Sequence, residues 1–66
     1  MQEMLHNCIY DLRNKAGLTQ EELAQKVGVT RQTIIAMEKG NYTPSVLLAL
    51  NLAKVFKQPV EKIFYS

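Results

Sequence analysis

The side chains best suited to specific chemistry in this chain lie together between residues 31 and 39. Ile34 and Met37 would share one side of a helix there, because successive helical residues turn by about 100°. The opposite side then carries Gln32, Ile35, Ala36 and Lys39, flanked by Arg31 and Thr33. Arginine and glutamine can each pair bidentately with a base edge, and alanine or isoleucine can contact a thymine methyl. This face suits a reader of the DNA major groove, and a merely solvated helix face is the alternative.

No set of residues for catalysis or for a metal site is visible in the sequence. The chain has one histidine, His6, and one cysteine, Cys8, and two ligands without a second pair make a weak case for zinc. An enzyme would need a nucleophile, or an acid and a base, collected in a pocket. We therefore expect no enzyme, no cofactor and no metal. Whether Cys8 senses redox state is left open.

The elements that must position this face form a helix, a tight turn and a second helix over residues 20–39. Thr19 and Glu22 have the spacing of a capping box at the start of the first helix. Gly28 suits a turn that needs a positive φ, and Ala24 is small enough for two helices to touch. Thr30 can cap the helix that follows. The spacing predicts a helix-turn-helix.

Three further apolar runs predict three further helices. The first holds Ile9, Leu12 and Ala16, between Asn7 as a cap and Gly17 as an end. The next enters at Thr43-Pro44-Ser45 and is expected to bury a stripe of Val46, Ala49, Leu50, Ala53 and Phe56. The last follows Pro59 with Val60, Ile63 and Phe64. We predict an all-α fold, a compact five-helix bundle forming one domain over residues 1–66; pairing of the tails at residues 4–6 and 64–66 as two short strands stays open.

Composition is that of an ordinary folded domain, with 47% hydrophobic and 21% charged residues among 66. A net charge of +2 does not by itself argue for nucleic acid. A single cysteine suits a reducing cytoplasm, and we expect neither a signal peptide nor a membrane segment. So short a chain leaves no room for a separate sensor domain, and no small-molecule effector is evident.

The motif in full resembles the phage repressor and Cro family, also called xenobiotic-response-element-like regulators. The resemblance is carried by LTQEELAQKVGVTRQTI at residues 18–34, EKGNYTPS at 38–45 and VEKIF at 60–64, in the family's order and spacing. It covers the chain from about Asn7 to Phe64. It implies sequence-specific DNA binding and favours base reading over a solvated face for the helix after Thr30.

The resemblance also implies roles for individual residues. Gln20 matches a position that contacts a phosphate and braces the recognition helix. The base-reading positions are matched by Arg31, Gln32 and Ala36, with Thr33 touching base or backbone. A loop that grips phosphates through side chains and backbone N–H groups is matched by Lys39, Asn41 and Tyr42. Arg13 and Glu38 match a salt-bridged pair. Ile35 and Ala36 depart from many relatives, which carry longer polar side chains there.

A regulator of this kind is expected to bind a near-palindromic operator as a homodimer and to act as a repressor by blocking the polymerase. The expected dimer interface is the apolar end formed by Val60, Ile63, Phe64 and Tyr65, with packing in the protomer's own core as the alternative. Leu48 is expected in the core, and Leu47 is open between core and partner surface. The competing class is a protein-interaction module of antitoxin type, which would be marked by an additional partner-binding tail.

Overall fold

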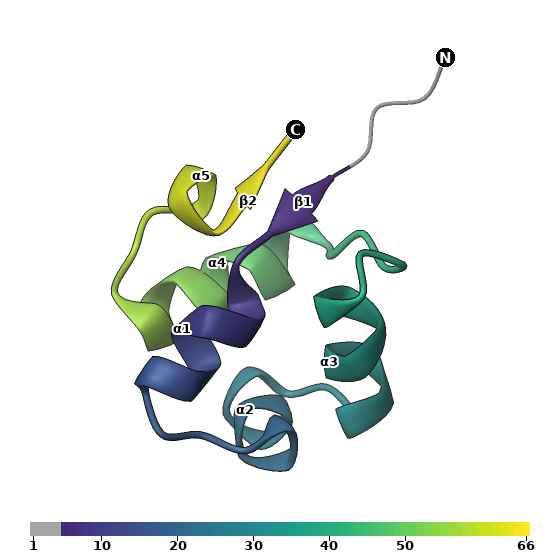
Figure 1. Ribbon diagram of the computed structural model, residues 1–66, viewed down its shortest axis with the longest axis vertical. Coiled ribbons are helices and arrows are strands. Elements are labelled where there is room, and N and C mark those ends of the chain that lie inside the picture. Colours follow the sequence, from purple (N-terminus) through teal and green to yellow (C-terminus); the bar gives the residue numbers. More distant parts are fainter. Residues whose placement is uncertain (1–4) are drawn as a thin grey trace.

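Helices α2 and α3 begin where side-chain caps satisfy their first backbone N–H groups. The computed structural model describes residues 5–66 and places α2 at Gln20–Val27 and α3 at Arg31–Glu38 (Figure 1). Thr19 Oγ1 accepts a hydrogen bond from the Glu22 N–H at 3.0 Å, and the Glu22 carboxylate accepts one from the Thr19 N–H at 2.8 Å. Thr30 Oγ1 accepts from the Thr33 N–H at 3.3 Å. The predicted capping box and the predicted Thr30 cap are both confirmed.

The first helix, α1, spans Ile9–Lys15 and starts one residue later than a cap at Asn7 would give. Cys8 occupies the N-cap position without a side-chain cap bond. Asn7 Oδ1 still accepts from the Ile9 N–H at 3.1 Å, while its amide nitrogen donates to the Met37 carbonyl at 2.8 Å. Asn7 therefore links the start of α1 to the end of α3 as well as helping to cap its own helix.

Helix α4, Val46–Phe56, buries a different face from the one predicted. Its buried residues are Leu48, Ala49 and Leu52, whereas Val46 and Leu50 are 77% and 48% exposed. The predicted stripe was wrong at these two positions, because the helix is apolar around most of its circumference and periodicity alone cannot select one face. The Ser45 hydroxyl caps it by accepting from the Leu48 N–H at 3.1 Å. Packing against α2 and α5 then decides the buried side.

One hydrophobic core draws on all five helices, the last of which is α5 at Val60–Ile63. Its fully buried side chains are Ile9, Leu23, Ile34, Met37, Leu52 and Ile63. The all-α fold with five helices is confirmed. The longest helix among the described residues has 11 residues, and none of the described helices is long and apolar enough to cross a membrane.

The tails of the described chain pair as two short antiparallel strands, β1 at His6–Asn7 and β2 at Phe64–Tyr65. His6 lies opposite Tyr65 and Asn7 opposite Phe64, and the two strands run side by side at one end of the bundle (Figure 1). The pairing left open from sequence therefore exists, although Met4 lies outside the described residues. It fixes the start of α1 against the end of α5, where the Cys8 N–H donates to the Ile63 carbonyl at 3.0 Å.

Candidate nucleic-acid interface

The angle between α2 and α3 is set by a turn of three residues, 28–30. Gly28 adopts the left-handed conformation with φ 75°, which costs a glycine little. The Val29 N–H returns to the Ala24 carbonyl at 3.0 Å, and Ala24 is fully buried where the two helices meet. This turn holds α3 across α2 and leaves one side of α3 at the molecular surface.

The outer side of α3 presents the side chains that the sequence singled out. Arg31 and Gln32 are exposed, whereas Thr33 and Ala36 are half-buried. Within the described part of the chain, neither Arg31 nor Gln32 uses its side chain in a hydrogen bond or an ion pair, so both are available to a ligand. The Thr33 hydroxyl lies 3.2 Å from the Thr30 hydroxyl, which occupies part of its bonding capacity. Ile35, expected on the exposed side, is also half-buried.

The C-terminal end of α3 is anchored by a buried ion pair between Arg13 and Glu38. Arg13 Nε donates to Glu38 Oε2 at 2.7 Å, and the two side chains are only 10% and 7% exposed. Arg13 Nη1 also donates to the Leu18 carbonyl at 2.9 Å. Since the hydrogen bond to Glu38 favours the charged guanidinium, it raises the pKa of Arg13 above its ordinary value. The pair implied by the resemblance therefore ties α1 and the chain before α2 to the recognition helix.

Gln20 joins this network from the start of α2. Its Nε2 donates to Glu38 Oε1 at 3.1 Å. An amide nitrogen carries a second hydrogen, so the bond to Glu38 leaves Gln20 a further donor. The bracing role implied by the resemblance is visible in this contact. No sequence pattern indicated two other contacts of Arg13. One is with the Leu18 carbonyl, and the other is with the Tyr10 ring, whose centroid lies 5.4 Å from the Arg13 guanidinium carbon.

The loop after α3 uses two of its backbone N–H groups for hydrogen bonds within the protein. The side chains of Lys39, Asn41 and Tyr42 are exposed as a phosphate-contacting loop requires. However, the Gly40 N–H donates to the Met37 carbonyl at 3.0 Å and the Asn41 N–H to the Ala36 carbonyl at 2.9 Å. With Gly40 at φ 81°, these two bonds are a Schellman motif that closes the helix. The Asn41 N–H, which the resemblance placed in the phosphate-gripping loop, is therefore already bonded within the protein, and the exposed side chains of the loop remain as candidates for phosphate contacts.

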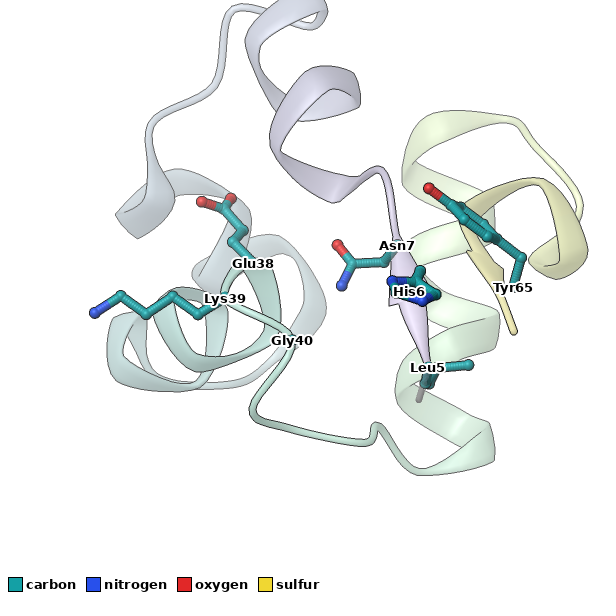
Figure 2. A pocket seen from close by; sticks show the side chains of 7 residues that line it. All are labelled: Leu5, His6, Asn7, Glu38, Lys39, Gly40 and Tyr65. Atoms are coloured by element: carbon teal, nitrogen blue, oxygen red, sulfur yellow. The ribbon is translucent and has the colours of Figure 1, made fainter. Parts of the chain in front are cut away.

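A hollow of about 180 Å³ lies between the strand pair and the end of α3, as Figure 2 shows. It is lined by Leu5, His6, Asn7, Glu38, Lys39, Gly40 and Tyr65. Pockets for drug-sized ligands have volumes of roughly 300–1,000 Å³. The hollow is smaller than such pockets. Within residues 5–66, no group of three or more His, Cys, Asp or Glu side chains is placed to hold a metal ion.

The apolar C-terminal residues divide between the core and the surface. Ile63 is fully buried and Phe64 is 7% exposed, so both pack inside their own protomer. These two side chains were expected at a dimer surface, with packing in the protomer's own core as the alternative. The alternative holds for both, because α5 and β2 close the bundle over α4 and β1. Val60 is half-buried, and Tyr65 is 49% exposed with its ring stacked on His6 at a centroid distance of 5.8 Å.

Comparison with known proteins assigns this arrangement to a family. A family model described as helix-turn-helix matches residues 9–63, nearly the whole of the described chain. The chain belongs to the helix-turn-helix family of phage-repressor and Cro type. The predicted resemblance is confirmed.

Relatives in this helix-turn-helix family span bacteria and archaea. The HTH-type transcriptional regulator YgzD of Bacillus subtilis is 48% identical over 61 residues, covering 92% of each chain. An HTH-type transcriptional regulator of Methanothermobacter thermautotrophicus is 52% identical over 61 residues, 91% of this chain and 88% of its own. The cryptic phage CTXphi transcriptional repressor RstR of Vibrio cholerae is 37% identical over 60 residues, 91% of this chain and 54% of its own. The family binds DNA, and these relatives carry the names of transcriptional regulators or of a repressor.

Proposed function

We propose that this chain is a sequence-specific repressor that binds a near-palindromic operator as a homodimer, with α3 in the major groove. The observation that carries the proposal is the outer side of α3, where Arg31 and Gln32 are exposed and make no side-chain hydrogen bond or ion pair with any of residues 5–66. Both side chains are suited to paired hydrogen bonds with base edges. Repression is supported by the similarity to the phage repressor RstR.

Base reading in this proposal falls to four residues of α3. Arg31 and Gln32 donate to or pair with base edges, Ala36 offers a small apolar surface to a thymine methyl, and Thr33 touches base or backbone. The burial of Ile34 and Met37 on the opposite side supports this orientation of the helix. Ile35 adds apolar surface beside Ala36, so the base sequence preferred here differs from that of relatives with polar side chains at this place.

Phosphate contacts fix the register of the protein on the duplex. They are assigned to Lys39, Asn41 and Tyr42, whose side chains are exposed after the helix, and to the second amide hydrogen of Gln20. Glu38 holds Gln20 and Arg13 at once, so the phosphate-contacting amide and the recognition helix share one support. The residues that contact the DNA phosphates and the helix that reads the bases are then held in a fixed geometry relative to each other.

The decisive experiment is selection of bound duplexes from a random DNA library at near-physiological salt. Wild type is compared with Gln32→Ala and with Gln25→Ala, a matched control because Gln25 is an exposed glutamine on α2. We expect a two-fold symmetric consensus that is kept by the control and relaxed at one base pair per half-site by Gln32→Ala. The loss at that base pair should be about 1–3 kcal/mol of discrimination.

Two results would contradict the proposal. Equal losses on selected and random DNA for Gln32→Ala would remove the base-reading role of that residue. No enrichment by folded wild-type protein would remove sequence-specific binding altogether. The antitoxin-type interaction module would then be tested next by capture of a protein partner.

A further inference from the structure

The side chain of Asn7 joins the strand pair to the end of the recognition helix. Its amide nitrogen donates to the Met37 carbonyl at 2.8 Å, and its Oδ1 accepts from the Ile9 N–H at 3.1 Å. A carbonyl can only accept and a backbone N–H can only donate, so these two partners fix which way the amide group is turned. Figure 2 shows the Asn7 side chain pointing from the strand toward the end of α3 near Glu38. One amide group therefore holds the start of α1 and the end of α3 together.

The backbone of Asn7 is itself held in place by the C-terminal end of the chain. Asn7 lies opposite Phe64 in the two-stranded sheet, and the N–H of the next residue, Cys8, donates to the Ile63 carbonyl at 3.0 Å. Ile63 is fully buried and Phe64 is 7% exposed, so this part of the sheet is fixed to the core. The bond from Asn7 to Met37 consequently ties α3 to a rigid support and not to a loose terminus.

The Met37 carbonyl lies where α3 passes into the loop that follows it. Besides the bond from Asn7, it accepts one from the Gly40 N–H at 3.0 Å. A carbonyl oxygen has two lone pairs, so these two donors use its full capacity. Gly40 stands between Lys39 and Asn41, whose exposed side chains are assigned to phosphates. The carbonyl that Asn7 holds is therefore the same one that sets the course of this loop.

We propose that Asn7 is a positioning residue for DNA binding, which fixes the loop of residues 39–42 through the Met37 carbonyl for its contacts with phosphates. This inference rests on the proposed function, which assigns those contacts to the loop. Asn7 then complements the ion pair at the same end of α3, since Arg13 holds the side chain of Glu38 and Asn7 holds the backbone of the preceding residue. Asparagine suits the place because its short side chain carries both an acceptor and a donor.

The test is DNA binding in a double-variant cycle of Asn7→Ser and Lys39→Ala, at a temperature where circular dichroism shows every variant folded. Serine keeps an oxygen acceptor for the Ile9 N–H but loses the amide donor to Met37. We expect Asn7→Ser to weaken binding to selected and random duplexes alike, by about threefold to tenfold. The affinity loss from Lys39→Ala should be at least about twofold smaller in Asn7→Ser than in wild type. Asn14→Ser, at an exposed asparagine on α1, is the matched control and should be additive with Lys39→Ala.

Amide hydrogen exchange of the full chain without DNA gives a second measurement. In Asn7→Ser we expect the Gly40 and Asn41 N–H groups to exchange about threefold faster or more, because the end of α3 opens more often. The Ile9 N–H should keep its protection, since serine still offers it an acceptor, whereas Asn7→Ala should lose protection at both places. Asn7→Asp keeps the shape and the acceptor but turns an oxygen toward the Met37 carbonyl, so it should repeat the pattern of Asn7→Ser.

The outcomes separate this inference from the proposed function. If Asn7→Ser lowers only the free energy of unfolding, and the folded variant binds DNA as wild type does, Asn7 is merely structural and the inference is overturned. Full additivity with a measurable Lys39→Ala loss, or unchanged exchange at Gly40 and Asn41, overturns it as well. All three results leave sequence-specific binding standing. No DNA binding by folded wild-type protein overturns the proposed function and with it the role in DNA binding, while the exchange data still decide whether Asn7 holds the loop.

Discussion

At the scale of single residues, Glu38 connects three helices of the fold. It accepts from Arg13 and from Gln20, and through them it joins α1, α2 and α3. Arg13 and Glu38 are both shielded from water. If one of the two side chains is removed, water cannot take its place beside the other at low cost. The recognition helix is consequently held at its far end by electrostatics and along its inner side by apolar packing.

Breaking this pair from one side should therefore be costly. We expect Glu38→Met to lower the free energy of unfolding by about 3–5 kcal/mol, because Arg13 is left as an uncompensated buried charge. A small domain of this kind has a total stability of roughly 3–5 kcal/mol, so the variant should be largely unfolded at room temperature. Urea denaturation followed by circular dichroism measures the change.

The double variant Arg13→Met/Glu38→Met is the control for that prediction. It removes both charges and keeps side-chain volume, so most of the lost stability should return. If the double variant is as unstable as Glu38→Met alone, the cost comes from the lost hydrogen bonds of the network and not from an unpaired charge, and the electrostatic account is wrong.

At the scale of elements, the helix ends show how local chemistry sets the boundaries. Glycine residues take the positive φ after α2 and α3, but Lys57 takes it after α4, with φ 54° and ψ 42°. A side chain with a Cβ pays steric strain in this conformation. The Gln58 N–H nevertheless closes onto the Ala53 carbonyl at 3.1 Å, so the chain accepts the strain to end the helix.

Replacing Lys57 by glycine should stabilise the fold. We expect Lys57→Gly to raise the free energy of unfolding by about 0.5–1 kcal/mol, since relief of strain exceeds the added entropy of the unfolded chain. For a domain of this size that corresponds to a melting temperature higher by roughly 2–8 °C. Lys54→Gly, at an exposed position inside α4, should have the opposite sign with a loss of about 1 kcal/mol. Thermal melts of the two variants side by side decide the sign.

The capping box of α2 predicts a dependence on acid. The hydrogen bond from the Thr19 N–H favours the ionised Glu22 carboxylate and lowers the pKa of Glu22 below its ordinary value. A lowered folded-state pKa contributes stability that is present above the unfolded pKa and is lost as pH falls through the folded pKa. Wild type should therefore lose its advantage over Glu22→Gln below about pH 4, where free glutamate protonates. Urea midpoints from neutral to acid pH measure this, and a constant difference between the two proteins would disprove it.

At the scale of the whole molecule, the positions of the cationic side chains matter more for DNA binding than the net charge. The net charge is only +2, so binding to DNA has to depend on where the charges lie. Arg31 and Lys39 flank the outer side of α3, while residues 41–53 after the helix contain no Asp, Glu, Lys or Arg. The outer side of α3 is thus the place where cationic side chains and base-reading side chains occur together.

The salt dependence of DNA binding tests the phosphate contact proposed for Lys39. We expect Lys39→Ala to weaken binding to selected and random duplexes alike and to reduce the slope of log affinity against log salt by about 1 per protomer, because one phosphate contact is lost. Gln32→Ala should leave the slope unchanged. Lys26→Ala, at an exposed position near the end of α2, is the control for loss of a positive charge elsewhere. An equal change of slope for Lys26→Ala and Lys39→Ala would argue against a specific phosphate contact at Lys39.

The sequence by itself determined the helix boundaries around the recognition helix and, with them, the family. Caps such as Thr19 and Thr30 and the turn at Gly28 act over three or four residues, so their types and spacing are sufficient to predict them. Tertiary structure alone decided which side of α4 is buried and that Ile63 and Phe64 belong to the core. The physical reason is that burial depends on partners distant in the chain, and an almost uniformly apolar helix carries no local signal for the side that it will bury.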